Sequence, residues 1–103
     1  MASIAMAMSA TVTIDRYVLA PLMRDLVGHD RRPAAYLVYL AVSSAASEAR
    51  SHRQLAELTG LSKRSVQDAV RHLERRGLVR VDRRAGTEPA LLTALTPWRR
   101  GAA

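Results

Sequence analysis

The 103-residue sequence contains no cysteine and no phenylalanine, and only one tryptophan and three tyrosines. The lack of cysteine excludes disulfide bonds and thiol chemistry, and it is typical of a cytoplasmic protein. Without phenylalanine the core must be built mainly from Leu, Val and Ala. No apolar run approaches the roughly 18 residues that a membrane-spanning helix requires. A chain of this length is expected to form one domain with one modest core.

The sequence also lacks the patterns that mark catalytic and metal sites. Its three histidines, His29, His52 and His72, do not have metal-ligand spacing or a recognisable array of companion carboxylates. We interpret His52 and His72 as surface residues and His29 as a loop residue. There is no glycine-rich phosphate loop and no nucleophile elbow. We therefore expect no catalytic residue, metal or cofactor, and an enzyme is the class that the sequence supports least.

Positive charge is concentrated in one third of the chain. Residues 1–49 carry four arginines and four acids, whereas residues 50–86 carry ten basic residues and four acids, so most of the net charge of +7 lies in that segment. Clustered cations favour a polyanionic partner, because binding phosphates releases condensed counterions. A solvated basic surface is the alternative. Arginine outnumbers lysine fifteen to one, which suggests a GC-rich coding genome and a bacterial source.

The first half of the chain predicts two helices. We expect residues 1–10 to be a flexible tail and Tyr17–Val27 to form a helix, although Pro21 is an alternative start. A second helix is expected to begin at Pro33 and run to about Ala49. Its segment Ala34–Val42 is apolar nearly all round, which predicts burial on more than one side. A buried strand is the alternative there, and the length and the alanines favour a helix.

The second half predicts two more helices with clear caps. Ser51 and Gln54 have the spacing of a capping box at the start of the third helix. Gly60 can adopt a positive φ and end it, Ser62 can cap the fourth helix, and Gly77 can end that helix in the same way.

A β-hairpin is expected to follow the fourth helix. Leu78–Val81 alternates apolar and polar residues as a half-buried strand does, and Ala90–Leu95 is the expected return strand, with a turn over Arg83–Pro89. The fold class is therefore mainly α with a small β-hairpin. We expect one domain over residues 11–98, followed by a short C-terminal tail over residues 99–103.

The fourth helix is strongly amphipathic. Its apolar residues recur at i, i+3, i+4 and i+7, namely Val66, Ala69, Val70 and Leu73. At 100° per residue, the opposite face holds Arg64, Asp68, Arg71 and Arg75, with Gln67 on its flank. An ordinary amphipathic helix with a solvated basic face is the alternative to a nucleic-acid contact.

The segment HRQLAELTGLSKRSVQDAVRHLERRGLVRV resembles the helix-turn-helix of winged-helix transcriptional regulators. The resemblance lies in Leu55-Ala56, in Thr59-Gly60-Leu61-Ser62, in Val66 and in the run from Leu73 to Leu78. The following hairpin, ending Leu95-Thr96-Pro97, is similar to the wing of MarR- and GntR-type repressors. This resemblance implies a helix-turn-helix over 51–76 and a wing over 78–95. It also implies a sequence-specific regulator of double-stranded DNA that is associated with the nucleoid when bound.

The resemblance and the local chemistry together give a set of candidate DNA-binding residues. Arginine can pair with guanine and glutamine with adenine in the major groove, while hydroxyls, lysine and free amides at a helix start suit phosphate. Arginines at a wing tip can reach phosphate or a narrow minor groove. The candidates are Ser51, Arg53, Ser62, Lys63, Arg64, Ser65, Gln67, Asp68, Arg71, Arg75, Arg83 and Arg84.

Two other functions and the oligomeric state stay open at this stage. A plasmid replication or partition factor would use the same fold, and some winged helices bind proteins instead of DNA. The two N-terminal helices would leave an apolar patch, so we expect a homodimer through them with the two recognition helices about one DNA turn apart. The alternative is that these helices close over each other within a monomer.

Overall fold

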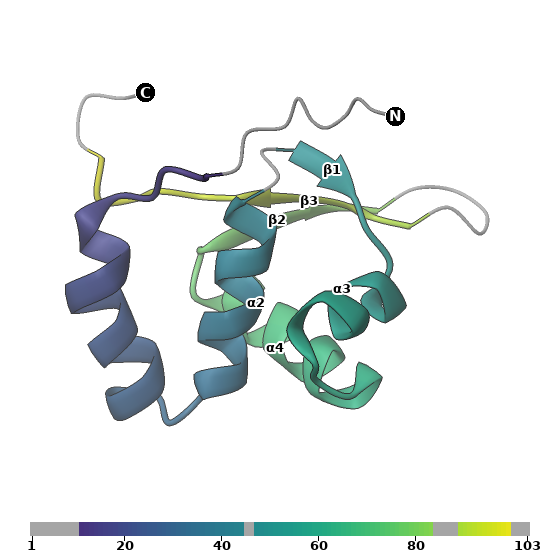
Figure 1. The fold of residues 1–103 in the computed structure, drawn as a ribbon, viewed down its shortest axis with the longest axis horizontal. Helices are drawn as coiled ribbons and strands as arrows, with labels where there is room; N and C mark the ends of the chain where they lie inside the picture. The colour runs from purple at the N-terminus through teal and green to yellow at the C-terminus, as the bar shows by residue number, and fades with distance from the viewer. Residues whose placement is uncertain (1–10, 45–46, 84–88, 100–103) are drawn as a thin grey trace.

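A computed structural model describes residues 11–44, 47–83 and 89–99 of the chain. Residues 11–15 carry no regular secondary structure, and a first helical segment then spans residues 16–29. The elements are two π-helical stretches, η1 (Val18–Leu22) and η2 (Arg24–His29), followed by α2 (Pro33–Ser43), β1 (Ser47–Ala49), α3 (His52–Thr59), α4 (Lys63–Arg75), β2 (Val79–Asp82) and β3 (Leu91–Ala94) (Figure 1).

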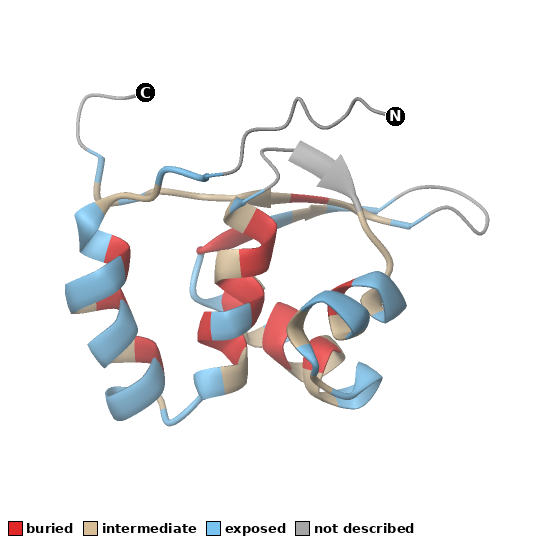
Figure 2. Cartoon of the chain, in the orientation of Figure 1, coloured by how far each residue is buried: buried red, intermediate tan, exposed pale blue. Residues whose placement is uncertain are grey.

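The first helical segment packs on α2 through one stripe of residues. Val18, Leu22 and Leu26, each four positions apart, are all buried. The π winding has more residues per turn than an α-helix, so a four-residue spacing keeps these side chains on one face. Pro21 lies inside η1, so it does not mark the start of the helix. Figure 2 shows the buried stripe facing α2 and the exposed stripe facing solvent.

Helix α2 lies at the centre of the molecule, and its burial on more than one side is confirmed. The prediction that it continues to Ala49 is wrong, because it ends at Ser43. The Ser43 and Ser44 hydroxyls donate to the carbonyls of Leu40 and Ala41, which competes with the helical pattern at this end. Residues 47–49 instead form β1, whose backbone pairs with β3.

The strands form a three-stranded antiparallel sheet with the order β1-β3-β2. The β2–β3 hairpin is the one expected from the sequence, with Val79 opposite Ala94 and Val81 opposite Leu92. The pairing of β1 with β3 was not predicted. In Figure 1 the strands lie along one side of the molecule and the helices pack beneath them.

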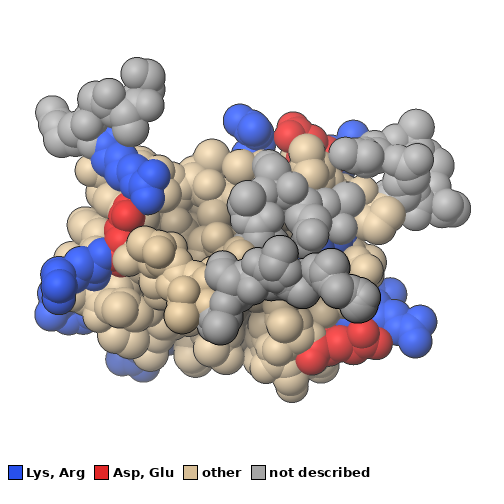
Figure 3. Space-filling model, turned by 45° about the horizontal axis from the view of Figure 1, so that its top comes forward, with Lys and Arg blue, Asp and Glu red and all other residues tan. Residues whose placement is uncertain are grey.

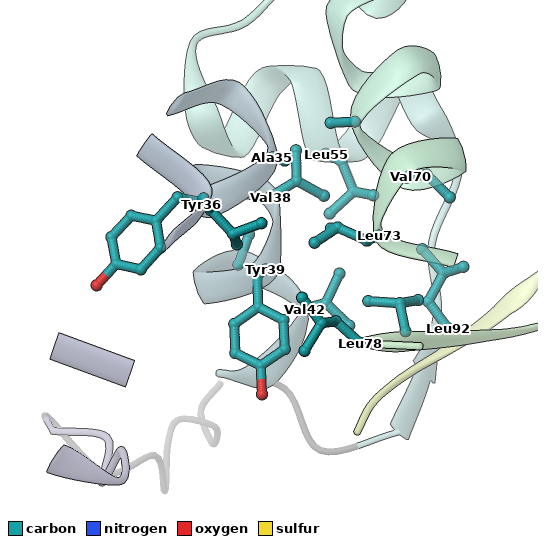
Figure 4. Close-up of a cluster of buried hydrophobic side chains, with 14 of the residues drawn as sticks. Ala35, Tyr36, Val38, Tyr39, Val42, Leu55, Val70, Leu73, Leu78 and Leu92 are labelled. Carbon is teal, nitrogen blue, oxygen red and sulfur yellow. The ribbon is translucent and has the colours of Figure 1, made fainter. Parts of the chain in front are cut away.

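The core gathers side chains from α2, α3, α4 and the sheet (Figure 4). Two buried tyrosines of α2 satisfy their hydroxyls on neighbouring elements. Tyr36 donates to the Val18 carbonyl and Tyr39 donates to the Leu95 carbonyl, each at 2.8 Å. Burial raises the pKa of Tyr39 to about 12. Both tyrosines therefore belong to the core, and they join α2 to the first helical segment and to the sheet.

The end of the sheet is anchored to the first helical segment through Trp98. Its ring stacks on Tyr17 with centroids 4.6 Å apart, and its Nε1 donates to Asp15 at 2.8 Å. Arg99 also donates to Asp15, and its hydrogen bond and that of Trp98 lower the pKa of Asp15 to about 2. Arg99, the first residue of the expected C-terminal tail, is thus held by an ion pair. The rest of that tail and the expected tail over residues 1–10 lie outside the described residues.

Candidate nucleic-acid interface

Helix α3 begins and ends as its sequence predicts. The Ser51 backbone N–H donates to the Gln54 side chain at 2.8 Å, and the Gln54 N–H donates to the Ser51 Oγ at 3.1 Å, which completes the capping box. The helix ends at Gly60, whose φ of +82° is accessible to glycine at little cost. The short turn that follows directs the chain into α4.

Helix α4 is closed at both ends by local hydrogen bonds. The Ser62 Oγ accepts the Ser65 N–H at 3.0 Å. At the other end the N–H of Leu78 donates to Leu73 and that of Gly77 donates to Glu74, which is a Schellman motif with Gly77 at φ +71°. Because β2 begins directly after this cap, the motif sets the direction in which the hairpin leaves the helix.

The two faces of α4 are those that its periodicity predicts. Val66, Ala69, Val70 and Leu73 are buried. On the opposite face, the side chain of Arg64 is 85% exposed and that of Arg71 is 61% exposed. Asp68 lies between these two arginines, 3.7 Å from Arg64 and 3.5 Å from Arg71. Exposed ion pairs of this kind contribute little, so both guanidinium groups can exchange Asp68 for another anion at small cost.

Two adjoining hollows lie between the start of α3, the outer side of α4 and the base of the β-hairpin. Their volumes are about 400 and about 430 Å³. We call them together the basic groove, because cations of all three elements line them. The lining residues are Arg50, Ser51, His52, Arg53, Lys63, Gln67, Val70, Arg71, Glu74, Val81, Arg83, Pro89, Ala90 and Leu92.

The structure distributes the predicted site residues over the groove and the helix face beside it. Six of them line the groove, and they are Ser51, Arg53, Lys63, Gln67, Arg71 and Arg83. Five others lie at the start of α4 or along its exposed side, and they are Ser62, Arg64, Ser65, Asp68 and Arg75. Arg84 lies outside the described residues.

Sequence reasoning missed three further arginines. Arg50 lines the groove just before the α3 cap. Arg31 and Arg32, before α2, line another hollow of about 220 Å³ with Ser65 and Asp68 of α4. In the sequence, Arg31 and Arg32 are only a pair of adjacent arginines in a segment without net charge. Nothing there indicates that they lie near α4, because the tertiary fold creates that proximity.

Arg83 fixes the base of the hairpin to α4. Its guanidinium lies 3.3 and 3.4 Å from the two carboxylate oxygens of Glu74. This hydrogen bond raises the pKa of Arg83. The β-hairpin and α4 are therefore joined both through the backbone at Gly77 and through this side-chain pair.

A second charged cluster connects the end of α4 to the first helical segment. We define it as the Asp30 cluster, comprising Asp25, Asp30, His72 and Arg76. His72 Nε2 lies 2.8 Å from Asp30, and Arg76 bonds both Asp30 and Asp25. The interpretation of His72 as a surface residue is wrong, because its side chain is only 14% exposed.

Asp30 is the acceptor around which this cluster is built, and it is 8% exposed. Burial opposes its ionisation, but hydrogen bonds from His29 and His72, together with the Arg76 charge, outweigh that effect and lower the pKa of Asp30 to about 2. The cluster therefore holds the C-terminal end of α4 in place with an ionised carboxylate.

In the view of Figure 3 the Lys and Arg side chains lie around the edges of the visible face, whose uncovered centre is uncharged.

Over the described residues, no group of three or more His, Asp or Glu side chains is arranged to hold a metal ion. No described helix is long and apolar enough to cross a membrane.

The capped helix pair and the β-hairpin that follows it form a winged helix-turn-helix fold, with β2 and β3 as the wing. Residues 50–80 match a family model described as winged helix-turn-helix DNA-binding. The chain is also similar to the crystal structure of the transcriptional regulator PA3341, with a TM-score of 0.54 and 24% identity over 80% of this chain. It spans 60% of that structure, and the match shows a shared fold. No curated protein sequence matches the chain.

Proposed function

We propose that this protein is a transcriptional regulator that binds double-stranded DNA in a sequence-specific manner. Helix α4 and its caps, residues 62–76, enter the major groove, and the wing contacts the backbone or the minor groove. Bound protein then blocks or recruits polymerase, with no enzymatic step. The same proposal places it in the bacterial cytoplasm, on the nucleoid.

The observation that carries this proposal is the polarity of α4. One stripe of the helix is buried in the core, and the opposite stripe presents Arg64, Arg71 and Arg75 to solvent beside the basic groove. The major groove of B-DNA is about 12 Å wide and admits a helix presented in this way. A winged helix used only to bind proteins would have no need of cations on that face.

The position of each residue suggests its role. Gln67 and Arg71 lie midway along α4, where a helix in the major groove approaches base edges, so we assign them to base contacts. Ser62, Lys63 and Ser65 surround the start of α4, where backbone amides and a lysine suit phosphate. Arg53 and Arg83 border the basic groove on either side and would hold the flanking backbone.

The test begins with selection of bound duplexes from random DNA at a stated salt concentration. On the selected site, Arg71→Ala and Gln67→Ala should each cost about 1–3 kcal/mol and relax the preference at one base position. Arg16→Ala is the matched control, because Arg16 is exposed on the first helical segment and does not line the basic groove. A wild-type protein without measurable affinity for any duplex would refute the proposal.

We further propose that the protein binds as a homodimer through its first helical segment. Leu19, Met23 and Val27 are spaced four residues apart on its outer side and are 52, 38 and 38% exposed. A row of large apolar side chains on an outer helix is unusual for a monomer. The domain measures 39 × 29 × 28 Å, so two copies side by side could present their α4 helices about one DNA turn apart.

Sedimentation equilibrium decides the oligomeric state. The wild type should have twice the 11.3 kDa mass of the chain. The double variant Leu19→Glu with Met23→Glu should sediment as a monomer. Leu58→Glu is the control, because Leu58 is equally exposed but lies on α3. A concentration-independent mass near 11.3 kDa for the wild type would rule out the dimer.

A further inference from the structure

His52 occupies the centre of the basic groove. It is the first residue of α3, directly after the Ser51 cap, and its side chain borders both hollows of the groove. The imidazole is partly exposed, and it takes part in no hydrogen bond or ion pair within the part of the chain that the structure describes. The sequence alone indicates only a surface residue at this position.

The groups that face His52 come from every element around the groove, and most of them are cations. They are Arg50 and Arg53 beside it, Lys63, Arg71 and Glu74 of α4, and Arg83 at the base of the wing. Glu74, the one acid in this set, is already paired with Arg83. Burial and the charges of Lys63 and Arg71 lower the pKa of His52 below 6.5. The free protein therefore carries a neutral imidazole here at neutral pH.

A DNA phosphate in the groove would reverse this balance. Its negative charge would offset the neighbouring cations, and its oxygen would accept a hydrogen bond from a protonated imidazole. Both effects favour the charged form of the histidine. A group that is protonated more readily in the complex than in the free protein takes up a proton on binding, so the affinity must depend on pH.

We propose that His52 is a phosphate-contacting residue that becomes protonated when the groove binds the DNA backbone. This proposal rests on the proposed function, and it adds a proton-coupled contact to it. Because the partner is a phosphodiester and not a base, the contact is independent of DNA sequence. The protein would then bind DNA more tightly as the pH falls.

The linkage has a definite sign and an upper limit. Affinity should rise as the pH falls from about 8 to about 6, by at most about tenfold per pH unit for one proton. The gain should level off below the pKa of His52 in the free protein, where both states are protonated. The added cation should also steepen the salt dependence at the lower pH by about one phosphate contact.

The experiment uses the full chain and a mixed-sequence duplex of about 30 base pairs, because a backbone contact needs no operator. Dissociation constants are measured by fluorescence anisotropy between about pH 8 and about pH 6 at constant ionic strength. Calorimetry in two buffers of different ionisation enthalpy measures the proton uptake directly. Far-UV circular dichroism of each variant shows that it is folded.

Two variants and one control separate His52 from other groups. His52→Gln should bind like the wild type at the higher pH and lose the gain at the lower pH. His52→Arg carries a permanent charge, so it should bind tightly at every pH. His29→Gln is the control, because the His29 side chain is 81% exposed and does not border the groove. This control should keep the wild-type pH dependence.

The outcomes distinguish the two proposals. DNA binding by the wild type that does not vary with pH, or a pH dependence that survives in His52→Gln, would overturn the role of His52 and leave DNA binding intact. Absence of binding to the duplex at every pH would overturn both.

Discussion

Replacing Asp30 by alanine should destabilise the protein far more than replacing Asp25, although both carboxylates contact Arg76. The side chain of Asp30 is 8% exposed, whereas that of Asp25 is 45% exposed. Asp30 also accepts a hydrogen bond from His72 at 2.8 Å. Without Asp30 the partly buried His72 has no acceptor in the cluster, while Arg76 keeps Asp25 at 2.9 Å.

The size of the effect follows from these contacts. A hydrogen bond to a charged group contributes roughly 1.5–3 kcal/mol, and an exposed ion pair contributes at most about 1 kcal/mol. Asp30→Ala removes the hydrogen bonds that Asp30 accepts from His72 and Arg76 and its exposed contact with His29, and Arg76 keeps its bond to Asp25. We therefore expect a cost of about 3 kcal/mol. Asp25→Ala should cost about 0.5 kcal/mol. In a domain of this size the first change lowers Tm by roughly 10–20 °C, and the second by a few degrees at most.

Urea denaturation at neutral pH, followed by circular dichroism, measures both values. The free energy of unfolding measured as a function of pH in the acidic range gives an independent test, since the pKa of Asp30 is lowered to about 2 in the folded protein. A lowered pKa means that ionised Asp30 stabilises the fold above the unfolded-state pKa of about 3.9, and that this stability is lost as the pH falls toward 2. Asp30→Ala should flatten this part of the profile. Equal costs for the two substitutions would refute the reasoning from burial.

Four further substitutions test the helix caps, one helical glycine and the contacts of Trp98. Gly77→Ala should cost about 1–2 kcal/mol because of its φ of +71°, whereas Gly28→Ala, in a helix with nothing within 4 Å, should stabilise the protein by about 0.5 kcal/mol. Ser62→Ala should cost about 1 kcal/mol through the lost cap, measured by urea denaturation. Trp98→Phe should keep the stacked ring but lose the bond to Asp15, at about 1–2 kcal/mol, and no change in Tm would contradict that assignment.

The parts of the fold that depend on local sequence were predictable. The Ser51 capping box, the glycine ends of α3 and α4, and the buried stripe of α4 all depend on residues within a few positions of one another. The parts that depend on distant partners were not. Strand β1 exists because its backbone pairs with β3, more than forty residues later, and nothing within Ser47–Ala49 predicts that pairing.

The candidate site likewise contains residues that the local sequence predicts and residues that only distant contacts bring together. The basic face of α4 follows from helical periodicity, so Arg64 and Arg71 were found. His72 and Asp30 are 42 positions apart, and only the packing of both α4 and the first helical segment against α2 brings them together. Arg31 and Arg32 approach the start of α4 for the same reason. Composition indicated which charges the chain has, and the tertiary fold determined which of them share a surface.

The course of β3 has a consequence for how two DNA half-sites would be spaced. This strand is central in the sheet, and the chain then runs through Leu95, held by Tyr39, to Trp98, stacked on the first helical segment. Only a few residues therefore separate the wing from the surface through which two copies would pair. Because this connection is short and fixed at two points, it is rigid and allows little change in the distance between the two wings. The proposed dimer would therefore tolerate little variation in the number of base pairs between half-sites.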